Sequence, residues 1–225
     1  MAALPVDFLF DYSSPWSYLA DATLSRWFSP GQITYVPVYL RGFESFARGV
    51  PYSPAKMAYL LKDMVRSAAH VGVPVAMPPV FPINGLCALR GAIAAQREGR
   101  FAEYHAAVFQ ATWLDGRDVS SKEVVAAIAR EVGAPSVADA LDEPGIKEAL
   151  RANTDRGVGR GAFGVPSFFV GEELFWGHDR MHLGGGQGLR RSMLPDRRRS
   201  EGAMLQALKR CDFAAPTAGP IPAEG

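Results

Sequence analysis

Residues 6–20 constrain what this chain can fold into more than any other stretch. The short apolar run at 6–10 predicts a buried strand. Ser14 and Pro15 follow with two helix-start signals, because a serine oxygen can cap free amides and a proline ring pre-sets φ for the first helical residue. Apolar residues then recur at helical spacing as far as Pro30, where we expect the helix to stop. The turn therefore places the Ser14 hydroxyl at the positive end of a helix, which is where ligands dock in open α/β sheets.

Composition and charge narrow the class of protein. The chain has 225 residues, 48% of them hydrophobic, which suffices for one domain with a large insertion or for two small domains. A formal net charge of +1 gives no electrostatic reason to bind nucleic acid or a membrane surface. Cys87 and Cys211 lie far apart without a C-x-x-C motif, which argues against a disulfide framework, a metal site and a redox dithiol. With neither a signal-peptide pattern nor a run long enough to span a membrane, we expect a soluble cytoplasmic protein.

Strand and helix signals divide the chain into three parts. A second strand is predicted at 33–40, where Pro37 suggests an edge position. The strand signal returns at 163–170, and 174–176 completes a hairpin that leads into another helix start near Asp179. The region between them is helical in character, and the helices expected there cover 54–71, 84–95, 100–112, 121–132 and 145–158.

The last part of the chain carries weaker signals. The glycine run at 184–188 predicts a flexible loop, and residues 200–211 predict a final short helix. Residues 213–225 are rich in Pro, Ala and Gly, which predicts a disordered tail.

Four short motifs occur in a fixed order along these elements. They read Phe-Asp-Tyr-Ser-Ser-Pro-Trp-Ser-Tyr-Leu-Ala at 10–20, Phe-Pro-Ile-Asn at 81–84, Phe-Gly-Val-Pro at 163–166 and Trp-Gly-His-Asp-Arg at 176–180. Together with the order of strands and helices, they resemble the thioredoxin-like fold. The resemblance is closer still to the family of kappa-class glutathione transferases and 2-hydroxychromene-2-carboxylate isomerases.

The resemblance implies a fold class and a domain plan. We expect an α/β protein in which a thioredoxin-like fold is interrupted by an inserted all-helical domain. The thioredoxin-like domain would comprise 1–40 and 157–212, and the helical insertion would comprise 41–156.

The same resemblance implies glutathione as a cofactor and assigns residues to it. In that family the serine before the proline binds the glutathione sulfur, which corresponds to Ser14. The residue before the later proline pairs its main chain with the cysteinyl part of glutathione, which corresponds to Val165. A third segment holds the γ-glutamyl end, where His178 replaces the usual Asn or Ser: Trp176, Gly177, His178 and Asp179.

A physical argument agrees with this arrangement. If the Val165–Pro166 bond is cis, the kink leaves the N–H and C=O of Val165 free, and an extended tripeptide can bind to them as an added strand. Asp179 can accept hydrogen bonds from an ammonium group, while free amides at a helix start can hold a carboxylate. A thiol that titrates at about pH 8.5 in water would then face Ser14, and a hydroxyl donor at a helix N-terminus would lower its pKa. We therefore expect Ser14 to donate to a thiolate nucleophile rather than to attack.

Each of these residues also has a purely structural interpretation. Ser14 and Asn84 could serve only as helix caps, although Asn84 is also a candidate substrate-binding residue. Val165 could simply precede an edge strand, Asp179 could be a helix-start acid and His178 a partly buried polar residue. These alternatives stay open at the level of sequence.

A serine where disulfide enzymes keep a cysteine excludes dithiol exchange, because a hydroxyl cannot form a mixed disulfide. The leading hypothesis is a glutathione-dependent isomerase acting on 2-hydroxychromene-2-carboxylate or a similar enone acid, in which the thiolate stabilised by Ser14 adds reversibly to the conjugated alkene. The alternatives are a kappa-like transferase that conjugates electrophiles and a thioredoxin-like protein that binds glutathione or a peptide without chemistry. A disulfide oxidoreductase ranks last.

The half of the site that would hold the small-molecule substrate is less well defined. One isomerase of that family has a lysine after the second strand, an Asn-Arg pair in the insertion and a tyrosine after the Phe-Pro-x-Asn motif. None of these three features has a counterpart here. Relatives are commonly homodimers, so we expect a homodimer. Several cations could serve an acidic substrate, and no motif selects among them: Arg41, Lys56, Lys62, Arg66 and Arg90.

Overall fold

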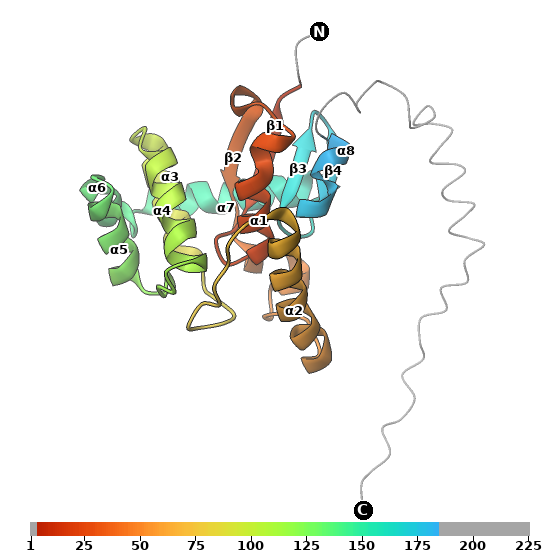
Figure 1. Cartoon of the computed structure of the whole chain (residues 1–225). Coiled ribbons are helices and arrows are strands. Elements are labelled where there is room, and N and C mark those ends of the chain that lie inside the picture. Colours follow the sequence, from red (N-terminus) through yellow and green to blue (C-terminus); the bar gives the residue numbers. More distant parts are fainter. Residues whose placement is uncertain (1–3, 185–225) are drawn as a thin grey trace, which may run out of the picture. The chain divides into compact units, whose positions relative to one another are not determined.

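A four-stranded sheet with the order β2-β1-β3-β4 forms the centre of the fold (Figure 1). The computed structural model describes residues 4–184. β1 (Val6–Phe10) pairs in parallel with β2 (Ile33–Pro37) and in antiparallel fashion with β3 (Ser167–Val170). β4 (Glu173–Trp176) completes the predicted hairpin with β3. The α/β class, the strand at 6–10 and the hairpin are therefore confirmed.

β2 lies at the edge of the sheet, as Pro37 predicts, because a proline cannot donate to a further strand. Side-chain amides cover its open carbonyls. Nε2 of Gln96 donates to the Tyr35 carbonyl at 2.8 Å, and Nδ2 of Asn153 donates to the Pro37 carbonyl at 3.3 Å. The edge is thereby protected against pairing with another strand.

The first helix, α1 (Pro15–Thr23), begins at the predicted cap and ends earlier than the apolar spacing suggests. The Ser14 side chain accepts from the Ser17 amide, and Pro15 occupies the first turn. The Thr23 hydroxyl donates to the Leu19 carbonyl, and the chain then continues as a short 3₁₀ helix instead of running on toward Pro30. The expected end of this helix is therefore wrong by several residues.

The remaining helices include every one predicted between the second and third strands. α6 was not predicted, because six residues are too few to show a helical period. The α-helices are α2 (Pro54–Val71), α3 (Leu86–Arg97), α4 (Phe101–Trp113), α5 (Lys122–Glu131), α6 (Pro135–Ala140), α7 (Pro144–Gly159) and α8 (Met181–Gly184). Short 3₁₀ helices occupy Leu24–Arg26, Pro30–Gln32, Leu40–Gly42, Glu44–Phe46 and His178–Arg180.

α2 to α7 all fall between β2 and β3 in the chain, which fits the predicted helical insertion. The boundaries proposed for the two domains stay a prediction. Residues 185–225 lie outside the described part of the chain, and with them most of the glycine run, the helix expected at 200–211 and the tail expected at 213–225. Among residues 4–184, no helix is both long enough and apolar enough to cross a membrane.

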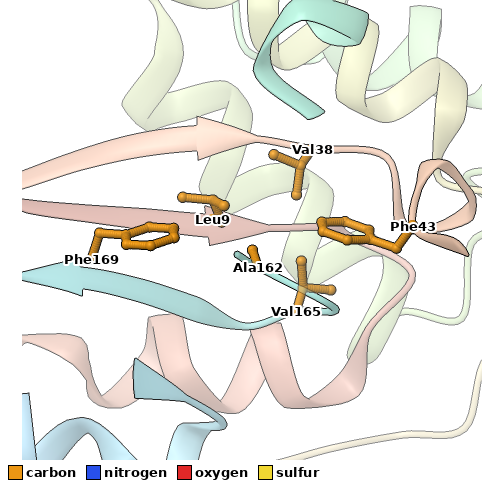
Figure 2. Packing of buried hydrophobic residues seen from close by; sticks show 6 residues of the cluster. All are labelled: Leu9, Val38, Phe43, Ala162, Val165 and Phe169. Atoms are coloured by element: carbon orange, nitrogen blue, oxygen red, sulfur yellow. The ribbon is translucent and has the colours of Figure 1, made fainter. Parts of the chain in front are cut away.

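A buried hydrophobic cluster joins the sheet to the loops at one end of it (Figure 2). The Val165 side chain belongs to this cluster and lies near Phe43 and Ala162 in the close view (Figure 2). Burial of this side chain anchors the segment that leads into β3. The members of the cluster are Leu9, Val38, Phe43, Ala162, Val165 and Phe169.

Candidate functional site

The register of the sheet brings the segments that carry the predicted site residues to one end of the strands. Because β3 runs antiparallel to β1, its first residue Ser167 lies opposite Leu9 near the end of β1, and the same Ser167 lies opposite Trp176 at the end of β4. The β1–α1 turn, the segment before β3 and the segment after β4 therefore meet. They line one cavity of about 340 Å³.

Most of the predicted residues line this cavity, and one does not. Asn84 is absent from the cavity wall. Its Oδ1 accepts from the Leu86 amide and from the Tyr39 hydroxyl, both at 3.3 Å. The N-cap residue of α3 is Gly85, so Asn84 is not the cap that the sequence suggested, and it holds a tyrosine that does line the cavity. The residues that the cavity brings together are Ser14, Val165, Trp176, Gly177, His178 and Asp179.

Ser14 lies at the N-terminus of α1 and is 5% exposed. Its amide donates to the Asp11 carbonyl at 3.0 Å, and its Oγ accepts from the Ser17 amide at 3.3 Å. An oxygen that accepts from an amide still carries its own hydrogen, so the hydroxyl is able to donate into the cavity. A donor at the positive end of a helix is suited to stabilising an anion.

Val165 presents main-chain groups to the same cavity. The Val165–Pro166 bond is cis, as the sequence argument supposed. Among the described residues, neither the N–H nor the C=O of Val165 has a hydrogen-bond partner. The next carbonyl, that of Pro166, accepts from the Gly177 amide at 3.0 Å, which ties this segment to the one after β4. The arrangement leaves one N–H and one C=O for an extended ligand.

The segment after β4 supplies a carboxylate and a ring. Gly177 has a φ of 103°, and a side chain there would meet the Asp179 carboxylate, so glycine is required at this turn. Asp179 also pairs with Arg180, with 2.5 Å between Oδ2 and Nη1. The His178 ring stacks on Trp16 with 5.1 Å between centroids, and burial lowers the pKa of His178. At neutral pH this ring is therefore an uncharged part of the wall.

Asp11 is a cavity residue that the sequence argument missed. It has no solvent exposure, and its carboxylate accepts from the Ser13 amide at 2.9 Å and from the Leu40 amide at 2.8 Å. Burial raises the pKa of Asp11, and these two hydrogen bonds oppose the rise. The position of an aspartate directly after a buried strand was the available signal. Asp11 ties the Ser14 turn to the segment after β2.

The wall formed by α2 and the loops beside it is mainly apolar, and it carries two cations and the carboxylate of Asp63. Arg41 and Lys56 line the cavity, and Lys62, Arg66 and Arg90 do not, so the structure selects two of the candidate cations. The Lys56 ammonium lies 4.2 Å from the centre of the Tyr52 ring. The apolar part of this wall comes mainly from α2 and the loops beside it, and includes Phe46, Val50, Met57, Leu60, Leu61 and Phe81.

Comparison with known proteins gives a consistent picture. The model of the DSBA-like thioredoxin domain matches residues 5–184. A 2-hydroxychromene-2-carboxylate isomerase of Pseudomonas putida is 30% identical over 186 residues, which cover 79% of this chain and 91% of the relative. A glutathione S-transferase kappa 2 of Caenorhabditis elegans is 27% identical over 199 residues, which cover 78% and 88%.

Solved structures agree with the sequence comparisons. A structure of 2-hydroxychromene-2-carboxylate isomerase superposes with a TM-score of 0.68 at 27% identity and covers 92% of this chain and 97% of its own. The predicted thioredoxin-like fold with a helical insertion is thereby confirmed.

Proposed function

Because this chain belongs to the DsbA-like thioredoxin family and its relatives include named isomerases and kappa transferases, we propose that it is a glutathione-dependent isomerase. The substrate we propose is 2-hydroxychromene-2-carboxylate or a similar enone acid. One observation carries the proposal: the Ser14 hydroxyl, the unpaired main chain of Val165 and the Asp179 carboxylate line a single cavity.

Glutathione fits these three features in one orientation. The main chain of its cysteinyl part pairs with the N–H and C=O of Val165, as an added strand would. Its ammonium group at the γ-glutamyl end is held by Asp179, and backbone donors of the same turn hold the adjacent carboxylate. The thiol then lies at the N-terminus of α1, where the Ser14 hydroxyl donates to the thiolate and increases its population at neutral pH.

The proposed reaction uses the thiolate as a borrowed nucleophile. The sulfur forms a bond to the electron-poor carbon of the conjugated alkene, and the electron pair of the double bond moves onto the enone oxygen as an enolate. The former double bond is now single and rotates. The enolate then re-forms the double bond in the new geometry and expels the thiolate, so glutathione is regenerated and no atom is gained or lost.

The wall formed by α2 and the loops beside it favours an acidic, flat substrate. Arg41 and Lys56 offer positive charge to a carboxylate, and the surrounding apolar side chains offer surface to an aromatic ring. We assign Arg41 and Lys56 to the substrate carboxylate as part of the proposal.

Replacement of Ser14 tests the proposal. We expect Ser14→Ala to lose roughly a hundredfold in kcat, in the range seen when one donor to a developing anion is removed. Because the substitution also removes a helix cap, Ser121→Ala is the matched control: Ser121 caps α5 by accepting from the Val124 amide at 3.3 Å and lies away from the cavity. The control should lose about 1 kcal/mol of stability and no activity. A Ser14→Ala protein that turns over at the parent rate would contradict the proposal.

Glutathione consumption separates the alternatives. An isomerase turns over many substrate molecules at constant glutathione, whereas a transferase consumes one glutathione for each product. A protein that only binds would be retained on immobilised glutathione and convert none of a panel of enones. Stoichiometric loss of glutathione would favour the kappa-like transferase, to which the kappa relatives also point.

A further inference from the structure

A chain of buried polar side chains lies behind the turn that carries Ser14. The Tyr12 hydroxyl is 3.0 Å from Nδ1 of His105, and Nε2 of His105 is 3.1 Å from Oδ1 of Asp21. Tyr12 has no solvent exposure and His105 is 5% exposed, whereas the Asp21 side chain reaches a partly exposed position. None of the three residues lines the cavity, so the proposed reaction does not use them directly.

The neighbours of His105 indicate which of its ring nitrogens carries a hydrogen. An ionised carboxylate cannot donate, so Nε2 of His105 carries the hydrogen that points at Asp21. In the tautomer with its hydrogen on Nε2, Nδ1 is an acceptor and the Tyr12 hydroxyl donates to it. Burial holds the pKa of Tyr12 well above its usual value, so the phenol keeps its proton. That tautomer of His105 pairs each ring nitrogen with one neighbour.

Aromatic rings enclose the imidazole and fix its place. A polar ring in such surroundings is costly to bury unless its nitrogens are hydrogen-bonded, so the two hydrogen bonds determine its orientation. The rings lie between 4.8 and 5.4 Å from it, centroid to centroid, and come from β1, the turn after it, β2 and α4: Phe10, Tyr12, Tyr35, Phe101 and Phe109.

His105 is hydrogen-bonded to residues on both sides of Ser14 in the chain. Tyr12 precedes Ser14 in the turn, and Asp21 lies in α1, the helix that Ser14 caps. A second side chain of α4 reinforces the contact, because Nε1 of Trp113 donates to the main-chain carbonyl of Tyr12 at 3.0 Å. The turn is thus fastened to the helical insertion through Tyr12 and to the sheet end through Asp11.

We propose that the Tyr12–His105–Asp21 chain positions the Ser14 hydroxyl toward the bound thiol. Its members are positioning residues, since none touches the reacting atoms. The kinetic part of the inference rests on the proposed function, whereas the positioning of Ser14 does not need a ligand to be observed.

Hydrogen exchange tests the positioning without any ligand. Tyr12→Phe removes the hydroxyl and keeps the ring. The Ser17 amide donates to the Ser14 carbonyl at 3.1 Å and to Ser14 Oγ at 3.3 Å, so its exchange reports the placement of Ser14 as a whole. We expect this amide to exchange about tenfold faster in Tyr12→Phe, the equivalent of one ordinary hydrogen bond.

Tyr104→Phe is the matched control. Tyr104 is equally buried on the same helix as His105, and its hydroxyl donates to the Ala88 carbonyl at 3.0 Å, away from the Ser14 turn. After correction for global stability, this control should leave exchange at Ser17 unchanged. Equal exchange at Ser17 in the two variants overturns the proposal.

Kinetics test the consequence for the reaction. Tyr12→Phe should lower kcat about tenfold while the KM for glutathione stays nearly constant. The acidic limb of the pH profile of kcat should move to higher pH, because the thiol loses its hydrogen-bond donor. In a Ser14→Ala background the Tyr12 substitution should have no further effect on kcat, because it acts through Ser14. Additive losses in the double variant overturn the proposal.

A second variant and the activity of the wild-type protein separate a failure of the positioning proposal from a failure of the proposed function. Should Tyr12→Phe fail to fold, Asp21→Ala removes the acceptor at the partly exposed end of the chain, and the same readouts should move in the same direction. If the wild-type protein proves to have no glutathione chemistry, that result contradicts the proposed function, and exchange at Ser17 still decides the positioning.

Discussion

The surroundings of His178 in the fold change the pKa of its side chain. In the sequence it is one of four scattered histidines, and in the fold its ring is half-buried against Trp16 in the cavity wall. Burial lowers its pKa because a charged imidazole loses water there, and the nearby carboxylates of Asp179 and Asp63 offset only part of that cost. A neutral, stacked ring extends the apolar wall beside Asp179.

The lowered pKa of His178 predicts a pH dependence of stability. The folded protein binds this proton less readily than the unfolded chain, whose histidine titrates near 6.5, so the free energy of unfolding should fall as the pH drops through 6.5. We expect acidification from about pH 7.5 to about pH 5.5 to destabilise the wild type more than His178→Asn, as measured by denaturant unfolding. The exposed His182→Asn is the control and should follow the wild type. Parallel curves for wild type and His178→Asn would refute this prediction.

Between elements, close packing of α3 against α4 depends on one glycine. A methyl group at Gly91 would overlap the hydroxyl and ring of Tyr104, which is fully buried and tied to the Ala88 carbonyl. An aromatic ring in a packed layer cannot give way as the end of a flexible side chain can. The two helices therefore approach as closely as they do only because position 91 lacks a side chain.

Two glycine-to-alanine substitutions measure this effect. Gly91→Ala should cost about 1–3 kcal/mol of unfolding free energy through overpacking. Gly159→Ala, at the end of α7, meets nothing within 4 Å and should be neutral or stabilise by up to about 1 kcal/mol through helix propensity. Urea unfolding of both variants gives the comparison. Equal stabilities would contradict the packing argument.

At the scale of the whole molecule, the cavity couples segments that are far apart in the chain. Its wall draws on the β1–α1 turn, on α2, and on the segments before β3 and after β4. A ligand that bridges these segments stabilises the folded state as a unit, since the unfolded chain has no such site.

Glutathione should therefore raise the Tm of the protein in a concentration-dependent way, reaching about 2.7 kcal/mol of added stability at a hundred times its Kd. Asp179→Asn should weaken binding at least about tenfold through loss of a charged hydrogen bond, and the Tm shift should shrink accordingly in a thermal scan. Glu172→Gln, in the exposed turn between β3 and β4, is the matched control and should keep the full shift. A full shift in Asp179→Asn would remove Asp179 from the glutathione site.

Local signals predicted much of the fold because their causes are local. The apolar run of β1, the Ser14 cap and the bounds of α2 follow from neighbouring residues. The end of α1 was predicted several residues too late, and the short α6 was not predicted. At Thr23 a side-chain hydrogen bond and the onset of a 3₁₀ helix prevailed over apolar spacing that continued to Trp27.

By itself, the sequence determined most of the segments that become strands and helices, and its resemblance to a known family named six residues that line the cavity. Capping, periodicity and turn chemistry sufficed for the segments because they act over a few residues, whereas the site residues came from the motifs that carry the resemblance. Only the tertiary structure decided that Arg41 and Lys56 face the cavity while Lys62, Arg66 and Arg90 do not, and that His105 bonds to a tyrosine 93 positions away. Such partnerships depend on strand register and on helix packing between distant parts of the chain, and these are settled only when the whole core closes.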